Sequence, residues 1–273
     1  MKSFHSRFEQ LWFYIVVALL WIVILFPFFW MVLSSFKTNS SLLQMEPDWF
    51  GEYTLNNYQN VFEDTQFLKN MKNSLIVSSF AVISALVIGL PAAYTIARYK
   101  MTFLAMVILI GRMIPGISLL VPWFIIFRSL GILNTYFGLV VSHLILTLPL
   151  TVWIIVAFIE DIPIELEEAA LIDGCSNFRI FYSIVLPLIR TGIVTVSILG
   201  FIFSWNHFLF ALVLSGADTQ TLPIVVFQFM QFDEINYGGL YAAATMITLP
   251  ILIIVYFVRN QFVSGLTIGS VKG

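Results

Sequence analysis

Six long apolar stretches alternate with shorter polar segments along the chain. They run over approximately residues 11–33, 74–97, 101–127, 137–159, 191–214 and 240–258. A helix needs roughly 20 residues to cross a hydrocarbon core about 30 Å thick, so the pattern predicts an all-α membrane protein with six transmembrane helices. The first stretch is too long for the apolar region of a secretory signal, and no small-residue cleavage pattern follows it. We therefore expect it to remain as an uncleaved span.

The composition agrees with this class. Hydrophobic residues make up 60% of the 273 residues, charged residues only 10%, and the mean hydropathy is +0.96, whereas a soluble domain has roughly 25% charged residues. We expect a single transmembrane domain over residues 1–273, surrounded by membrane lipid. The net charge of −2 gives no indication of a nucleic-acid partner. The only cysteine, Cys175, excludes a disulfide framework and a cysteine-cluster metal site.

The distribution of Lys and Arg predicts the orientation. With both termini in the cytoplasm, the inner segments carry eight basic residues and the outer segments four, as the positive-inside rule favours. The eight are Lys2, Arg7, Arg98, Lys100, Arg179, Arg190, Arg259 and Lys272, and the four are Lys37, Lys69, Lys72 and Arg128. The loop at about 160–190 is then cytoplasmic. The connections at about 34–73 and 215–239 are then outside, and composition leaves open whether the first is a docking surface or a solvated loop.

The second and third spans carry packing signals. Small residues recur every fourth position in the second span, which allows another helix to approach closely: Ala81, Ala85, Gly89, Ala93 and Ala97. The pattern does not say whether that helix belongs to this chain or to a partner. Prolines predict kinks in both spans, at Pro91, Pro115 and Pro122.

Little chemistry is available inside the predicted membrane region. No Asp or Glu falls within the six spans, and the basic or titratable candidates are Arg112, His143 and His207. This argues against a proton-coupled or ion-coupled mechanism. The sequence has no Walker A, HExxH or GxSxG motif, so we predict no catalytic residue, no metal site and no cofactor bound by this chain. If transport is active, its energy must come from another protein.

The polar candidates inside the membrane have two interpretations each. Adjacent Asn206 and His207 either face a translocation path or bond neighbouring helices. Arg112 is either a ligand or a paired structural residue, and a paired role is more common. His143, alone among apolar neighbours, is expected to be a hydrogen-bonded residue in helix packing.

The loop at about 160–190 gathers acidic residues that a simple connector does not need. Pro163 suits a first helical turn and Gly174 suits a helix end. Three acids between them complement the positive end of a helix dipole: Glu165, Glu167 and Glu168. These signals predict a short helix at about 163–173. Ser176 is a candidate cap for a second helix leading to Pro187. The residues alone are compatible with a docking knob and with an ordinary solvated loop.

At this loop the chain resembles a known family. Glu168, Ala169 and Ala170 are followed after three residues by Gly174, and after nine more by "IVLP". This spacing is similar to the EAA loop of the membrane subunits of ABC importers, and "LEEAALIDGCSNFRIFYSIVLPL" resembles their carbohydrate-importing, maltose-type branch. Further segments, such as "FIFSWNHFLFALVLS" and "FVSGLTIGSVKG", are similar as well, so the resemblance covers about residue 11 to the end.

The resemblance implies a type I ABC importer permease fold with a cytoplasmic coupling helix. It implies that Glu168 makes polar contacts in a groove of the ATPase subunit, that Ala169 and Ala170 allow close approach, and that Gly174, supported by Asp173, permits the turn. Movement would pass through Leu186 and Pro187 to the fifth span. The tail is implied to reach the ATPase interface, through Gly265, Thr267, Gly269, Lys272 and Gly273.

Two positions depart from the family pattern. Thr191 stands where relatives often have a second proline, so a softer kink is expected after "LPLIR". His207 follows Asn206 where relatives often have an acidic residue, which leaves no acid-dependent role at that position.

Three functions remain open from the sequence. The favoured one is a permease subunit that moves a sugar or sugar derivative across a bacterial or archaeal cytoplasmic membrane. The resemblance implies a second permease, two ATPase subunits that hold ATP and Mg, and an extracytoplasmic solute-binding protein as partners. The alternatives are a self-contained secondary carrier or channel, and a membrane enzyme or scaffold. The sequence does not identify the sugar.

Overall fold

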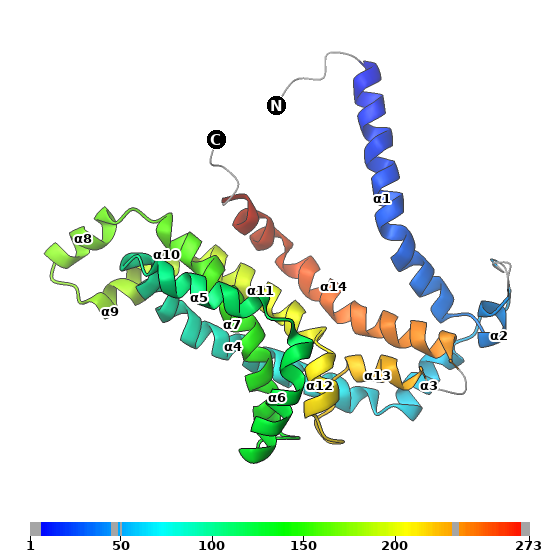
Figure 1. The fold of residues 1–273 in the computed structure, drawn as a ribbon. Helices are drawn as coiled ribbons and strands as arrows, with labels where there is room; N and C mark the ends of the chain where they lie inside the picture. The colour runs from blue at the N-terminus through cyan, green and yellow to red at the C-terminus, as the bar shows by residue number, and fades with distance from the viewer. Residues whose placement is uncertain (1–6, 45–48, 50, 231–234, 269–273) are drawn as a thin grey trace. The chain divides into compact units, whose positions relative to one another are not determined.

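The chain is built from helices. A computed structural model describes residues 7–44, 49, 51–230 and 235–268, and over these residues it contains helices and two isolated β-bridges but no strand (Figure 1). Four helices are long and apolar enough to cross a membrane: Glu9–Ser35, Phe67–Arg98, Tyr136–Glu160 and Tyr237–Phe257. Two bent helix pairs raise this to six spans if each pair crosses once. The all-α prediction is confirmed.

The helices fall into two compact units. The first comprises Met1–Phe67 and Val225–Leu249, and the second comprises Leu68–Ile224 and Pro250–Gly273. Three helices cross a boundary between the units along the sequence: α4 (Phe67–Arg98), α13 (Pro223–Gln228) and α14 (Tyr237–Ile268).

The first unit joins α1 (Arg7–Ser35), α2 (Asn39–Leu42) and α3 (Asn56–Asp64). Asn57, which is buried on α3, donates from Nδ2 to the carbonyl oxygens of Ser35 at 2.9 Å and Lys37 at 2.8 Å. These carbonyls lie at and just after the end of α1, where backbone carbonyls lack a helical partner. One amide therefore binds the end of α1 to α3.

The second unit is organised around α4 (Phe67–Arg98), α7 (Tyr136–Glu160) and α11 (Arg190–Trp205). The small-residue stripe of α4 is buried, and a Cβ on Gly89 would lie only 3.0 Å from Cγ2 of Thr151 on α7. The stripe therefore packs within this chain, which answers the question that the sequence left open. The core continues on α7 through Val152, Ile155 and Ile159.

The predicted third span, at about 101–127, is not one helix. It consists of α5 (Thr102–Met113) and α6 (Gly116–Ser129), which meet at 93°. Ile114 between them is extended, with ψ of 123°, because the ring of Pro115 disfavours a helical conformation in the preceding residue. The prediction of a kink at Pro115 is thus confirmed, and the bend divides the predicted span into two helices. α4 and α6 continue past Pro91 and Pro122.

The predicted fifth span, at about 191–214, is also divided. α11 ends at Trp205, and α12 (Leu209–Leu214) follows after three residues. Asn206 caps α11, and its side-chain amide donates to the carbonyl oxygen of Ile202 at 2.9 Å. Short polar side chains compete with the helix for hydrogen bonds to backbone groups. The break between α11 and α12 therefore falls at Asn206 and His207.

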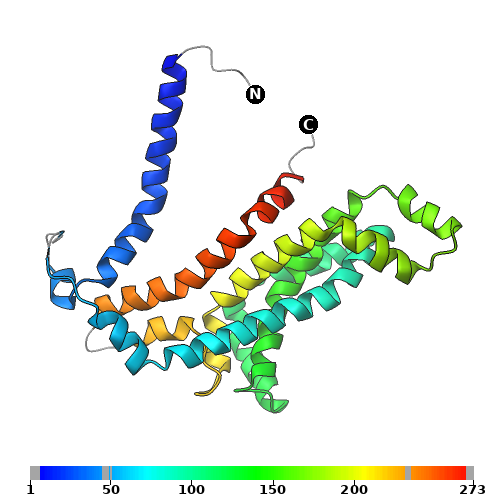
Figure 2. The ribbon, with the colours of Figure 1, turned by 180° about the vertical axis from the view of Figure 1, so that it is seen from behind.

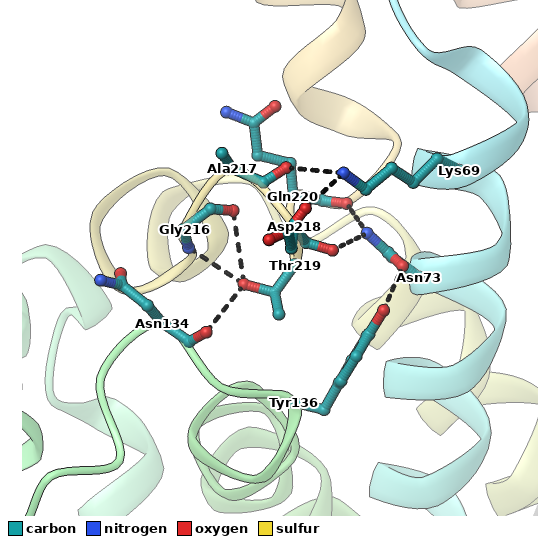
Figure 3. A network of polar contacts seen from close by, with 9 residues as sticks. All are labelled: Lys69, Asn73, Asn134, Tyr136, Gly216, Ala217, Asp218, Thr219 and Gln220. Carbon is teal, nitrogen blue, oxygen red and sulfur yellow. Dashed lines mark hydrogen bonds and ion pairs between the residues drawn. The ribbon is translucent and has the colours of Figure 1, made fainter.

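At one end of the second unit, the connection after α12 is bound to α4 and α7 (Figure 3). Asn73 of α4 is buried and donates from Nδ2 to the carbonyl oxygens of Asp218 at 2.9 Å and Gln220 at 2.8 Å. Its Oδ1 accepts from the hydroxyl of Tyr136 at 2.7 Å. Lys69 forms an ion pair with Asp218 at 2.7 Å. These contacts fix a loop that is about 150 positions away from α4 in the sequence.

Candidate functional site

At another end of the same unit, α8 (Glu165–Ile172) and α9 (Asn177–Ile180) form a helical hairpin, which Figures 1 and 2 both show projecting beyond α4 and α11. We call residues 163–188 the knob. A helix predicted at about 163–173 is therefore present, although it begins two residues later than expected. Ser176 accepts from the backbone N–H of Arg179 at 3.3 Å, which confirms the predicted cap.

The turn of the knob depends on Gly174. Its φ of +82° lies in the left-handed region, which glycine adopts without steric cost. The N–H of Cys175 donates to the carbonyl oxygen of Ala170 at 2.9 Å, and the N–H of Gly174 donates to that of Leu171 at 3.0 Å. This pair of bonds is a Schellman motif. It ends α8 and reverses the chain, as the sequence predicts for this glycine.

The outer surface of the knob combines an acidic residue with apolar side chains. Glu168, Ala169 and Asp173 are exposed, whereas Ala170 is buried against the core. Ile172 and Phe178 are 87% and 72% exposed. Leu166, Leu171 and Tyr182 are also exposed. Exposed apolar patches of this kind mark interaction sites.

The inner side of the knob is held by charges. Glu167 of α8 is buried, and its Oε1 lies 2.6 Å from Nη2 of Arg98, the last residue of α4. Its Oε2 accepts from the hydroxyl of Tyr94 at 2.7 Å. The sequence analysis did not single out this group. Its one local signal is the spacing of three between Glu167 and Ala170, which places both on the same helical face.

Where the knob meets α11, the chain is bent strongly. A π-helical turn at Phe181–Val185 (η1) leads into α10 (Leu186–Leu188), and residues 177–188 meet α11 at 74°. Leu186 is half-buried against the core and Pro187 is exposed. Pro187 cannot donate a backbone hydrogen bond, and Ile189 leaves the helical conformation with ψ of 14°. The expectation of a softer kink than in relatives, drawn from Thr191, stays a prediction.

The candidate pathway residues lie apart from the knob in the sequence. The ring of His207 is half-buried, with its centroid 5.3 Å from that of His143. Nδ1 of His143 lies 2.7 Å from Oγ of Ser204, whereas its buried Nε2 has no hydrogen-bond partner, so the prediction of a satisfied His143 holds at one ring nitrogen. Arg112 is exposed and lies over the ring of Phe203 at 5.9 Å from its centroid. Asn206 is exposed as well.

The predicted tail is only partly visible. Gly265 and Thr267 fall in the last turns of α14. Gly269, Lys272 and Gly273 lie outside the described residues. Within the described part of the chain, no group of three or more His, Cys, Asp or Glu residues is arranged to hold a metal ion.

Helical spans, broken spans and a projecting knob together define a multi-pass membrane protein. The model of the family described as binding-protein-dependent transport system inner membrane component matches residues 85–268. The chain belongs to this family, and the resemblance noted from its sequence is confirmed.

The chain is similar to named permeases over nearly its whole length. It is 32% identical to the diacetylchitobiose uptake system permease protein DasC of Streptomyces coelicolor, over 98% of this chain and 99% of that protein. It is 35% identical to the trehalose/maltose transport system permease protein MalG of Thermococcus litoralis, over 92% and 93%.

Solved structures share the fold. A chain of a bacterial ABC transporter involved in the import of the acidic polysaccharide alginate matches with a TM-score of 0.75 at 21% identity, over 96% of this chain and 99% of that one. The predicted permease fold is therefore confirmed.

Proposed function

We propose that this chain is a permease subunit of an ATP-driven importer that moves a sugar or sugar derivative by alternating access. The support for the substrate class is that relatives similar over nine-tenths of the chain are named for diacetylchitobiose, trehalose and maltose. In this proposal the transporter takes up its solute from an extracytoplasmic binding protein. The pathway is completed by a second, related permease.

The proposed coupling element is the knob. Its exposed face presents Glu168 and Ala169 beside apolar side chains, and this face is the observation that carries the proposal. In it, the knob lies in the cytoplasm with both chain termini and docks in a groove of an ATPase subunit. Ala170 and Gly174, with Asp173, shape the docking helix. Two such subunits hold the ATP and Mg, and closure of their dimer moves the knob.

The movement is proposed to pass along the chain to the transport path. Leu186 and Pro187, at the 74° bend, connect the knob to α11. α11 ends at Asn206 and His207, which we propose to line the path together with Arg112. The tail from Gly265 to Gly273 is proposed to contact the ATPase.

The experiment that tests this proposal is a pull-down of the tagged chain from its native membrane in mild detergent. The parent chain is compared with Glu168→Lys, with Gly174→Pro and with Asp218→Lys, a matched charge reversal at the other end of α4. We expect the parent and Asp218→Lys to retain an ATPase and a second permease, and the two knob variants to lose the ATPase. Recovery of the intact parent chain alone would contradict the proposal and favour a self-contained carrier.

A second measurement tests the pathway residues. His207→Ala is compared with the parent for uptake of radiolabelled trehalose, maltose and diacetylchitobiose, and for the amount of assembled complex. A pathway role predicts reduced uptake with normal assembly. Normal uptake would show that the His207 ring serves only helix packing.

A further inference from the structure

Two side chains of α4 converge on the carboxylate of Glu167, and one of them also binds the backbone that precedes α8. The guanidinium of Arg98 binds Oε1 through Nη2 at 2.6 Å and through Nε at 2.7 Å. The same guanidinium donates to the carbonyl oxygen of Ile162, just after α7, at 3.3 Å. Tyr94 donates to Oε2 at 2.7 Å. α4 is therefore joined by side chains to α8, and Arg98 also binds the link between α7 and α8.

The contact is almost dry. The side chain of Glu167 is 6% exposed and that of Arg98 is 13% exposed. A buried ion pair contributes little net stability, because desolvation offsets the attraction, but both of its members must stay in register once they are buried. Since both oxygens of Glu167 are bound, the carboxylate has one favourable orientation, and the helix that carries it is oriented as well.

Apolar packing holds only part of α8. Ala170 of α8 packs in the apolar core. An open cavity of about 420 Å³ adjoins the ion pair, and Tyr94, Arg98 and Glu167 are among the residues that line it. Where α8 borders this cavity, the ion pair and the Tyr94 hydrogen bond hold it to α4.

We infer that Glu167, Arg98 and Tyr94 form a positioning clamp that makes α8 and α4 move as one body. The inference rests on the proposed function, in which α8 receives the movement of the ATPase. It adds a second route for that movement: besides the chain through Leu186 and Pro187 to α11, the clamp transmits it directly to α4. The clamp residues do not touch the ATPase or the sugar, and act by fixing the angle of the docking helix.

The experiment measures the distance between α4 and α8 directly. Spin labels are placed at Ile83→Cys on α4 and Ile164→Cys at the N-terminal cap of α8, both exposed, in a chain with Cys175→Ser. The distance distribution is recorded by pulsed electron paramagnetic resonance in the assembled transporter, first without nucleotide and then with trapped ATP and Mg. We expect one narrow distribution that stays the same in both states. A shift between the states would overturn the inference, because α4 and α8 would then move separately.

Substitutions decide whether the clamp is responsible. Glu167→Gln removes the charge at nearly constant shape, and Glu165→Gln is the matched control, an exposed acid on the same helix. We expect the distribution to broaden for Glu167→Gln, to stay narrow for Glu165→Gln, and to narrow again in the charge-swapped pair Arg98→Glu with Glu167→Arg. An unchanged distribution in Glu167→Gln would overturn the inference.

The same labels separate this inference from the proposed function. The comparison of parent and Glu167→Gln is repeated in the purified chain without partners, where it reports only how firmly α8 is held. If no ATPase is recovered with the parent chain, the proposed function fails, while the broadening in Glu167→Gln still tests the clamp. If the ATPase is recovered and the distribution is insensitive to the substitution, the clamp fails alone.

Discussion

The two ends of α4 are each bound to a distant segment by an ion pair, and the two pairs differ in burial. At the N-terminal end, the side chains of Lys69 and Asp218 are 38% and 91% exposed. At the C-terminal end, those of Arg98 and Glu167 are 13% and 6% exposed. An exposed pair typically contributes about 0–1 kcal/mol, whereas removing one partner of a buried pair costs about 3–5 kcal/mol.

The difference shows how each end of α4 is held. At the exposed end, the neutral amide of Asn73 makes the buried contacts and the ion pair lies outside them (Figure 3). At the buried end, the charges themselves form the contact. Removing a contact of a neutral amide leaves no unpaired charge. Removing one member of the buried pair leaves the other charge buried, so the position of α8 depends on both partners. The predictions below test this contrast in order of expected effect.

The largest effect is expected from Arg98→Ala. The substitution leaves the carboxylate of Glu167 buried without a cation, which should destabilise the chain by about 3–5 kcal/mol. The measurement is the midpoint of unfolding in mixed detergent micelles, followed by circular dichroism. Arg179→Ala, at an exposed arginine of the knob, is the control and should change stability by less than about 0.5 kcal/mol. Equal effects of the two substitutions would show that Glu167 reaches solvent without Arg98.

The next largest effect is expected from Asn73→Ala at the opposite end. The variant removes three hydrogen bonds and leaves two loop carbonyl groups with fewer partners, at a cost of about 2–3 kcal/mol. Tyr136→Phe removes only the bond to Oδ1 and should cost about 1 kcal/mol in the same assay. If the two substitutions cost the same, the bonds from Nδ2 to the loop do not hold it.

A smaller effect is expected from Gly174→Ala. Nothing lies within 4 Å of a Cβ built at this position, so the cost is conformational and not steric packing: a φ of +82° costs an alanine about 1 kcal/mol. Gly174→Asn should cost less, because asparagine tolerates the left-handed region. Thermal unfolding of the detergent-solubilised chain measures both. A loss much larger than this would mean that the Schellman turn cannot form with any side chain present.

The sequence predicted the local features of the site and missed the contacts between distant segments. Three local features depend only on residues a few positions apart, so the residue types predict them. They are α8, the turn at Gly174 and the cap at Ser176. The break at Pro115 was predictable in the same way, although the apolar run around it suggested one span. Apolar composition indicates that a segment lies in lipid, but it does not show whether the segment forms one continuous helix.

The clamp could not be predicted in this way. Arg98 and Glu167 are 69 positions apart, and nothing in the sequence states which of the adjacent acids Glu167 and Glu168 turns inward. The same holds for the loop at Asp218, which reaches α4 only in the folded chain. The interpretation of the second-span stripe was likewise incomplete until the structure placed α7 against Gly89.

The smallest effect is expected from Asp218→Asn. The hydrogen bond and the charge of Lys69 lower the pKa of the Asp218 carboxyl below its ordinary value of 3.8. Because the folded state has the lower pKa, the pair stabilises the fold above pH 3.8, and this contribution is lost as the pH falls through the lowered pKa. The parent should therefore exceed the variant slightly in stability at neutral pH and equal it in acid.

Salt provides the control for this last comparison. Since both partners are exposed, added salt should remove the difference at neutral pH, whereas the cost of Arg98→Ala should persist because the Glu167 carboxylate lies away from the ions. The unfolding midpoints of the parent and both variants are compared at low and high salt. A difference for Asp218→Asn that survives high salt would show that the exposed pair is screened no more than the buried one, and the contrast between the two ends of α4 would fail.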